Sequence, residues 1–291
     1  MSVGISPPGF RLPARSHVGS VRLQVADLDR SIAFYRDVVG FTGIMRTNGG
    51  ARLSARAGEP VLLELDEKAG ARPVSRRGLL GLYHFAVLLP TRPALGAFVR
   101  HLADVPMQIG MADHSYSQSI YLYDPDGLGV EVYADQPRET WVAHNGEYVG
   151  TVDPLDVNAL VAIADPAPWP GLPAGTTIGH VHLYIGDLAQ AAAFYHAGLG
   201  FDRVGNFAGA LFVSAGGYHH HVGLNTWAAG APVAGDHDAR LLEWRLVVPD
   251  RQTVDDLARH LAQAGIETER DGDNFLARDP WNIAVTVKSA D

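Results

Sequence analysis

The chain has 291 residues, a net charge of −9 and 47% hydrophobic residues, a balance typical of a globular protein with one large domain or two ordinary ones. It has no block of Lys and Arg, no apolar run of membrane-spanning length and no signal-peptide core, so we expect no nucleic-acid partner, no membrane partner and a cytoplasmic location. Cysteine is absent, which excludes disulfides and thiolate ligands and leaves His and carboxylates to bind any metal.

The first elements in chain order belong to a pattern that occurs twice. Residues 25–35 and 185–195 lie 160 residues apart, and each runs from a strand-like end through an Asp to a Phe-Tyr pair. Asp is a favourable helix N-cap, and the apolar residues at i, i+4 and i+7 predict one buried helix stripe. Gly40 and Gly200 fit the ends of these helices, and three short strands should follow each helix.

A second pattern also occurs twice: the segment from Tyr83 to Ala103 resembles the segment from Trp244 to Ala262, at an offset of 159. Each copy is a strand followed by a helix. Each then closes with an Asp-Pro turn, at Asp124 and at Asp279, before a final strand. The two patterns together predict a chain of four similar units.

We therefore predict an α+β fold of four βαβββ units. The units span residues 17–68, 80–135, 177–227 and 240–288, and an N-terminal arm covers 1–16. By this division residues 17–135 form the first domain and 177–291 the second. The connection between them, 136–176, is rich in Pro, Asp and Gly and is long enough to cross from one barrel to the other.

The Phe-Tyr…Gly-Phe helix, the Asp-Pro-Asp-Gly…Glu ending and the fourfold plan resemble the vicinal oxygen chelate superfamily. This superfamily includes glyoxalases, fosfomycin-resistance enzymes and extradiol catechol dioxygenases. The resemblance covers all of the chain except the arm and the connection. It implies that units pair into cupped half-barrels, and that the first and last strands of paired units supply the metal ligands.

Residues that suit a metal concentrate in units two and three. Unit two has His84 on its first strand and Glu131 on its last, and unit three has His180 on its first strand. Unit one has Ser20 at the position of His180, and unit four has Glu243 at the position of His84. We infer that units two and three face each other. Two His and one carboxylate leave one face of a metal open, as in non-haem Fe(II) oxygenases.

The segment from His114 to Glu131 carries a more specific pattern. It reads His, five residues, Ile-Tyr, two residues, Asp-Pro-Asp-Gly, three residues and Glu. This resembles the extradiol dioxygenase signature, although Ala112 departs from it. The resemblance implies that Glu131 is an iron ligand, and that His114 and Tyr121 lie beside the substrate oxygens.

Three consecutive histidines, His219, His220 and His221, follow two glycines and precede an apolar run, which predicts the start of a strand. Alternation would then place His219 and His221 on one face and His220 on the other. The run resembles the His-His pair that carries the acid/base histidine of extradiol enzymes, which implies this role for His220. We expect His219, His221 and His182 to contact the substrate, His182 because it shares a strand face with His180.

The resemblance thus implies an extradiol ring-cleaving dioxygenase of aromatic catabolism that acts on a catechol-type diol with O₂. Its metal would be Fe(II), with Mn(II) as the substitute, and the chain could form a homo-oligomer. The apolar pocket wall should come from residues such as Phe85, Phe212, Leu224 and Trp227.

Two other functions fit the same sequence. In a glyoxalase or thiol transferase, one histidine of the run would be a fourth ligand to a non-redox metal. In a metal-free small-molecule binding protein, such as a resistance protein, the side chains of His84, Glu131 and His180 would lie apart.

Overall fold

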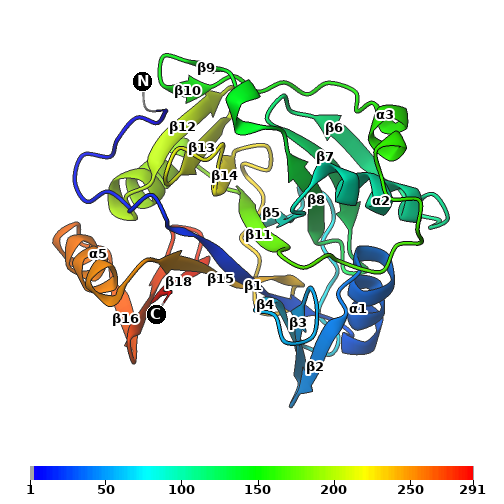
Figure 1. The fold of residues 1–291 in the computed structure, drawn as a ribbon. Coiled ribbons are helices and arrows are strands. Elements are labelled where there is room, and N and C mark those ends of the chain that lie inside the picture. The colour runs from blue at the N-terminus through cyan, green and yellow to red at the C-terminus, as the bar shows by residue number, and fades with distance from the viewer. Residues whose placement is uncertain (1–2, 291) are drawn as a thin grey trace.

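The computed structural model describes residues 3–290, apart from the side chain at position 206. It contains two eight-stranded sheets with helices on their outer faces (Figure 1). Each unit runs strand, helix and three strands, and the four units follow one another as predicted. The predicted α+β fold of four βαβββ units is therefore confirmed.

The first sheet is built from units two and three. Its strands, in spatial order, are β12 (Asp202–Phe207), β13 (Ala210–Ser214), β14 (Val222–Asn225), β11 (Thr177–Tyr184), β5 (Gly81–Leu88), β8 (Gly129–Asp135), β7 (Ser117–Tyr123) and β6 (Gly110–Asp113). The first strands of the two units, β5 and β11, pair antiparallel at the centre. The inferred pairing of units two and three is confirmed.

The second sheet is built from units one and four. Its order is β16 (Thr268–Asp271), β17 (Asn274–Arg278), β18 (Ala284–Ser289), β15 (Arg240–Val248), β1 (His17–Val25), β4 (Val61–Glu67), β3 (Gly50–Ser54) and β2 (Gly43–Thr47). Here β1 and β15 are the antiparallel central pair. Each sheet therefore combines one unit from either half of the chain.

The helices begin where capping residues predict. They are α1 (Leu28–Phe34), α2 (Arg92–Leu102), α3 (Val157–Ala162), α4 (Leu188–Ala191) and α5 (Arg251–Gln263). The side chains of Asp27 and Asp187 accept hydrogen bonds from the backbone of Arg30 and Gln190, as N-caps do. Among the described residues, no helix is long and apolar enough to cross a membrane.

A π-helical turn continues α1 and α4, at Tyr35–Val39 and at Ala192–Gly198. Gly40, with φ of 102°, ends the first of these turns in the left-handed region. These turns hold the tyrosines of the repeated Phe-Tyr pair, Tyr35 and Tyr195, and both are buried. Tyr35 Oη donates to Asp124 at 3.0 Å and Tyr195 Oη to Asp279 at 2.9 Å. Each bond joins one unit to the Asp-Pro turn of the next.

The connection between units two and three does more than link them. It contains a short 3₁₀ turn (Arg138–Thr140), a two-stranded ribbon of β9 (Ala143–His144) and β10 (Glu147–Tyr148), and α3. The connection leaves the end of β8 and returns to the start of β11 in the same sheet. On its way it passes the concave side of the first sheet, where Thr151 contacts His114.

Candidate metal centre

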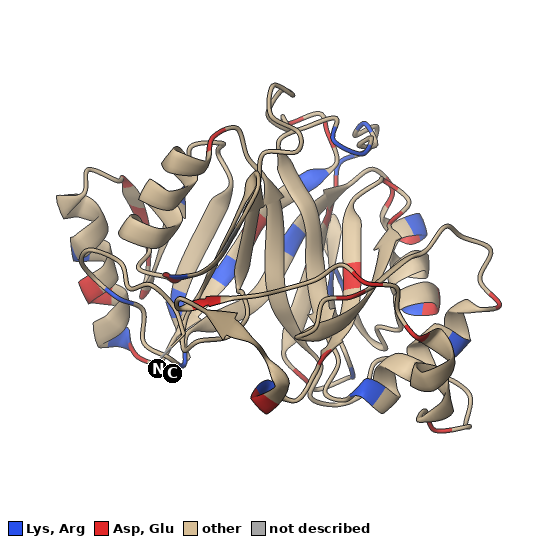
Figure 2. Ribbon diagram, turned by 90° about the horizontal axis from the view of Figure 1, so that it is seen from above, with Lys and Arg blue, Asp and Glu red and all other residues tan. Residues whose placement is uncertain are grey.

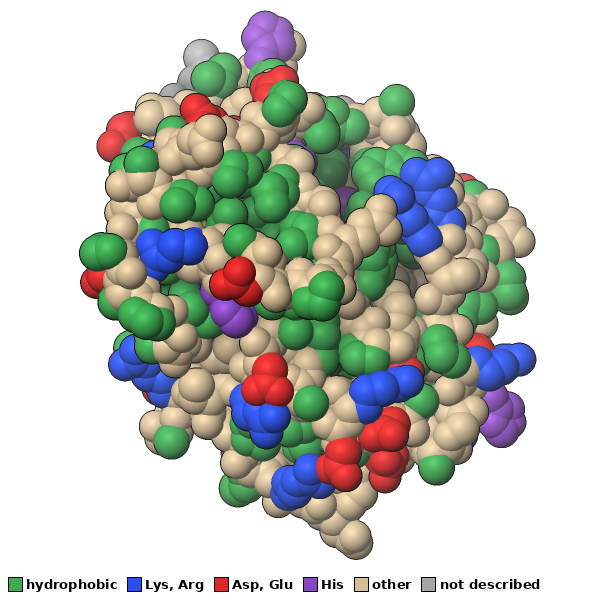
Figure 3. Space-filling model, turned by 90° about the vertical axis from the view of Figure 1, so that its right-hand side faces the viewer, with side chains coloured by type: hydrophobic (Ala, Val, Ile, Leu, Met, Phe, Trp, Pro, Cys, Tyr) green, Lys and Arg blue, Asp and Glu red, His purple; other side chains and the backbone are tan. Residues whose placement is uncertain are grey.

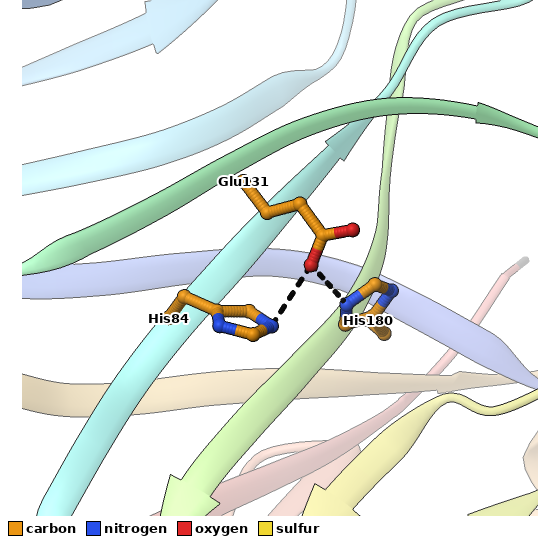
Figure 4. Close-up of side chains that lie close together, drawn as sticks. All are labelled: His84, Glu131 and His180. Atoms are coloured by element: carbon orange, nitrogen blue, oxygen red, sulfur yellow. Dashed lines mark hydrogen bonds and ion pairs between the residues drawn. The ribbon is translucent and has the colours of Figure 1, made fainter. Parts of the chain in front are cut away.

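Three adjacent strands bring together the side chains of His84, Glu131 and His180, from β5, β8 and β11 (Figure 4). The Nε2 atoms of His84 and His180 lie 2.9 and 3.0 Å from the same oxygen, Oε2 of Glu131. Each of the three residues offers one ligand atom, and these three atoms lie within 4.8 Å of one another. Each residue is at most 4% exposed, so the three converge beneath the surface.

These distances fit a shared metal ion. Metal–ligand bonds of about 2.1 Å place two ligands at right angles about 3.0 Å apart. Although Nε2 of His84 lies 2.9 Å from Glu131, it is not aligned for a hydrogen bond, and Nδ1 has no partner among the described residues either. A buried imidazole with both nitrogens unpaired is costly, so an ion bound at Nε2 would satisfy an otherwise orphaned atom.

The electrostatics of the triad favour the protonation states that a metal needs. Burial lowers the pKa of His84 and of His180, although Glu131 partly opposes the effect. Burial alone would raise the pKa of Glu131, but the two histidines outweigh it and hold that pKa well below its usual range. Neutral imidazoles and an ionised carboxylate are the forms that bind divalent metals.

A hydrogen-bond chain runs beside the triad. Tyr121 on β7 is the register partner of Glu131, and its hydroxyl lies 2.7 Å from Nε2 of His114. Nδ1 of His114 lies 2.7 Å from the carbonyl oxygen of Thr151, which can only accept. Nδ1 therefore donates, and in this tautomer Nε2 accepts the hydrogen bond from the hydroxyl of Tyr121. Burial raises the pKa of Tyr121 well above its ordinary value, so the phenol stays protonated.

The three consecutive histidines do not begin a strand, contrary to the prediction, because β14 starts only at Val222. The reason lies in the two preceding glycines. Gly216 and Gly217 adopt φ of 63° and 66°, and Arg138 binds both of their carbonyl oxygens. The chain turns here and passes through a loop before it joins the sheet. Strand alternation therefore does not set the faces of the three rings.

The loop directs the three rings differently. His220 lines the pocket, and its ring centroid lies 4.1 Å from that of His180. His219 connects His220 to Asp135, with 2.9 Å between the two Nδ1 atoms and 3.0 Å from Nε2 of His219 to the carboxylate. His221 instead accepts from the backbone of Ala215 at 3.1 Å, and burial lowers its pKa to about 3.

The hydrogen bonds of His219 fix the tautomers of this chain. An ionised Asp135 can only accept, so Nε2 of His219 donates to it. In the tautomer of His219 that donates through Nε2, Nδ1 is an acceptor, and Nδ1 of His220 must be the donor. This leaves Nε2 of His220 with a free lone pair. Burial lowers the pKa of His220 well below its ordinary value, mainly through desolvation, so the ring is neutral.

A cavity of about 310 Å³ opens onto His84 and Glu131 of the triad, and the surface view shows a hollow with histidine at its floor (Figure 3). Its wall comes mainly from the first sheet: Tyr83, His84, Ala112, His114, Tyr116, Tyr121, Glu131, His182, Phe207, Ala210, Phe212, His220 and Trp227. The connection adds Gly150, Thr151 and Val152. Of the three expected substrate contacts, His182 lines the cavity, whereas His219 and His221 lie outside its lining.

The apolar residues that line the cavity agree only in part with those expected from the sequence. Phe212 and Trp227 line the cavity, but Phe85 and Leu224 are fully buried in the core on the opposite face of the sheet. The sequence did not predict the hydrogen bond between Thr151 and His114. It is formed by a backbone carbonyl group, which every residue of the connection has, so no sequence pattern distinguishes Thr151. Its contact with His114 exists only once the connection folds back over the sheet.

The second sheet has charged residues where the first sheet has the triad. Figure 2 shows charged residues on strands as well as on the outer helices. Arg245 forms ion pairs with Glu64 at 2.6 Å and with Glu243 at 3.3 Å, and also contacts Ser20 at 3.4 Å. These carboxylates already have a cationic partner. They are therefore structural, and the candidate metal centre belongs to the first sheet.

Comparison with known proteins places this geometry in a family. Residues 17–132 and 177–285 match the sequence model of the Glyoxalase/Bleomycin resistance protein/Dioxygenase superfamily. The chain belongs to this superfamily. The first matched segment contains units one and two, and the second contains units three and four. The matched residues therefore include all three members of the triad.

Individual relatives agree with this assignment. A curated protein of Bacillus subtilis (strain 168) named catechol-2,3-dioxygenase is 43% identical over 269 residues, which are 91% of this chain and 94% of that protein. A solved structure from Bacillus subtilis subsp. subtilis strain 168 has a TM-score of 0.64 at 14% identity and covers 96% of this chain and 86% of its own. Glyoxalase I from Zea mays has a TM-score of 0.55 at 15% identity, with 94% and 92% covered. The two structures show the shared fold.

Proposed function

We propose that this superfamily member is an extradiol ring-cleaving dioxygenase that uses Fe(II), or Mn(II) in its place, to cleave a catechol-type diol with O₂. The observation that carries the proposal is the convergence of His84, Glu131 and His180. Two of them, His84 and Glu131, line a pocket that also contains His220 and the pair of His114 and Tyr121. The 43% identity to a protein named catechol-2,3-dioxygenase supports it.

The pocket has the parts that such a reaction needs. A metal bound by the triad would lower the pKa of the catechol hydroxyls and hold the diol beside O₂ on its open face. The reaction breaks one ring C–C bond next to the diol and places both atoms of O₂ in the product, a muconic semialdehyde. The number of protons is the same before and after, so one group that takes a proton and returns it is sufficient.

His220 is suited to that proton transfer. The free lone pair of Nε2 belongs to a pocket-lining ring, and neutral imidazole can take a proton from a catechol hydroxyl. The positive charge that develops on His220 is then stabilised through His219 by the carboxylate of Asp135. Asp135 and His219 act as positioning residues, because they set the tautomer of His220 and lie outside the lining of the pocket.

Tyr121 and His114 are placed to contact the substrate oxygens from the opposite wall. Both line the pocket, and their mutual hydrogen bond fixes the orientation of the phenol. His182 completes the polar floor. Its Nε2 accepts from the amide of Asn225 at 2.9 Å, which leaves Nδ1 as a donor for the substrate.

The two competing functions fit the geometry less well. The described metal-type cluster has three members and does not include His220, whereas a glyoxalase-like site needs a fourth ligand. A metal-free binding protein requires the triad to be spread apart, yet its ligand atoms lie within 4.8 Å of one another. The open face of a three-ligand centre favours the dioxygenase.

The test combines metal analysis with a ring-cleavage assay on anaerobically prepared protein. We expect about one iron per chain and O₂ consumption equal to the yellow product formed from catechol. Glu131→Ala should abolish iron retention, since it removes the anionic ligand, whereas Glu243→Ala in the second sheet should retain iron. The proposal would be refuted if the protein were active without iron or manganese, or if no O₂ were consumed when catechol is added.

A further inference from the structure

The mouth of the pocket carries three exposed apolar side chains from three separate parts of the chain. Val152 of the connection is 83% exposed, Phe207 at the end of β12 is 40% exposed and Trp227 after β14 is 41% exposed. All three line the cavity above the triad. We call these three residues the apolar collar. Exposed apolar residues that converge at the mouth of a cavity mark a surface for an apolar ligand group.

The two aromatic members of the collar are held in place by the wall. Phe207 packs edge-to-face on Phe212, with 5.5 Å between ring centroids. Trp227 packs on Tyr83 at 5.8 Å, and its backbone N–H donates to the side chain of Asn225 at 3.0 Å. These contacts fix the rings without covering their outer faces, so a ligand group finds a preformed apolar surface.

The described pocket lining includes no Lys or Arg. Its only carboxylate is Glu131, whose charge the metal would take up. Arg76 and Arg77 act electrostatically on Tyr83, but both are exposed and neither is part of the lining. A substrate carboxylate at the collar would lose part of its hydration and would find no Lys or Arg in the lining, which costs free energy. An apolar substituent would instead bury surface.

We propose that the apolar collar selects catechols that carry an alkyl or aryl substituent over catechols that carry a carboxylate. This rests on the proposed dioxygenase function and adds the substrate class to it. The cavity volume of about 310 Å³ lies at the small end of ligand pockets, so it suits one ring at the metal and a short substituent at the collar.

The first experiment compares catechol, 4-methylcatechol, 4-ethylcatechol and 3,4-dihydroxybenzoate by steady-state kinetics with the iron-loaded enzyme. We expect kcat/KM for 4-ethylcatechol to exceed that for 3,4-dihydroxybenzoate at least about tenfold. KM should fall about fourfold at most for each added methylene group. An equal or higher kcat/KM for the carboxylated substrate would overturn the proposal.

Substitutions then locate the selectivity. Trp227→Ala should lower the ratio of kcat/KM for 4-ethylcatechol over catechol about tenfold. Val152→Ser provides a second test that does not depend on folding, since that side chain is already exposed, and should lower the same ratio. The control Val233→Ala, at an exposed apolar residue outside the pocket, should leave it unchanged. Unchanged selectivity in both collar variants would show that the collar does not bind the substituent.

A binding measurement separates failure of this inference from failure of the proposed function. Equilibrium dialysis with metal-free protein should show tighter binding of 4-ethylcatechol than of 3,4-dihydroxybenzoate. If no catechol is cleaved but this preference holds, the dioxygenase function is refuted and the collar is supported. Equal binding of both ligands overturns the collar. A double variant, Arg76→Ala with Arg77→Ala, should leave the affinity for 3,4-dihydroxybenzoate unchanged, because neither cation lines the pocket. A large loss of that affinity would show that these cations reach the carboxylate and would contradict the proposal.

Discussion

The hydroxyl of Tyr121 lies 2.7 Å from Nε2 of His114 and donates its proton to it, because Nδ1 of the same ring already donates to the carbonyl of Thr151. Tyr121→Phe removes this donor while the ring stays in place. We expect kcat for catechol to fall about tenfold to a hundredfold, because the substrate oxygens lose a positioned hydrogen-bonding group. Steady-state kinetics and iron analysis measure the effect.

Tyr123→Phe is the matched control, since Tyr123 is 39% exposed on the same strand and lies outside the pocket lining. It should retain normal kcat and iron. Iron content should also be normal in Tyr121→Phe, because the phenol is not a ligand. Loss of iron from that variant would mean that Tyr121 supports the metal centre rather than the substrate.

Asp135 accepts from His219 at 3.0 Å, and this contact sets the tautomer of His220. Asp135→Asn keeps an oxygen acceptor but removes the negative charge that stabilises protonated His220. We therefore expect kcat to fall about tenfold with little change in KM or iron content. Asp135→Ala, which also removes the acceptor, should be slower still. A change confined to KM would contradict the role of Asp135 as a positioning residue for proton transfer.

His221 should make the stability of the protein depend on pH. Its folded-state pKa of about 3 is below the ordinary value of 6.5, because burial disfavours the charged ring. Below pH 6.5 the unfolded chain binds a proton that the folded chain does not, so stability is lost as the pH falls. This group alone should contribute a loss of about 1.4 kcal/mol per pH unit in the free energy of unfolding.

His221→Asn isolates this contribution, since its amide oxygen can still accept from Ala215. Denaturant unfolding of metal-free protein at pH 7, 6 and 5 should show a shallower pH dependence in the variant. His144→Asn, at an exposed position in β9, is the control and should keep the wild-type slope. Equal slopes in wild type and His221→Asn would show that the ring is not kept neutral in the fold.

The two repeated tyrosines should contribute equally to stability. Each donates to a buried carboxylate oxygen that has no other donor among the described residues, Tyr35 to Asp124 and Tyr195 to Asp279. Tyr35→Phe should lower the free energy of unfolding by about 1–3 kcal/mol, and Tyr195→Phe should do the same.

The free energy of unfolding should be measured at pH 8, because burial raises the pKa of Asp124 to about 7 and that of Asp279 to about 6. Both carboxylates are then ionised, and an unpaired oxygen costs most. Tyr123→Phe again serves as the control. A cost below about 0.5 kcal/mol in both variants would contradict the structural role of these bonds.

Much of this architecture could be predicted from local sequence. The Asp caps, the Phe-Tyr helices and the Asp-Pro turns are set by interactions within a few residues, and their recurrence revealed four units. His84, Glu131 and His180 stood out because their strand positions recur in each unit, while other units carry Ser20 or Glu243 there. A repeated local pattern thus identified both the fold and the residues that suit a metal.

Other features could only come from the folded chain. Local sequence favoured a strand at His219, but two left-handed glycines and the hydrogen bonds of Arg138 hold the run in a loop. That loop decides that His220 alone of the three rings lines the pocket. In the same way, Phe85 and Leu224 are apolar strand residues like Phe212, and only the face of the finished sheet separates core from pocket.

By itself the sequence determined the four-unit plan, because helix caps, helix ends and turns depend on contacts close in the chain. The unequal distribution of metal-type residues and the spacing from Tyr121 to Glu131 can be read directly from the sequence. The tertiary structure decided how the connection crosses the sheet, where Thr151 orients His114 and Val152 joins Phe207 and Trp227 at the mouth. These are meetings between residues far apart in sequence. Their positions depend on long-range packing, which no local pattern encodes.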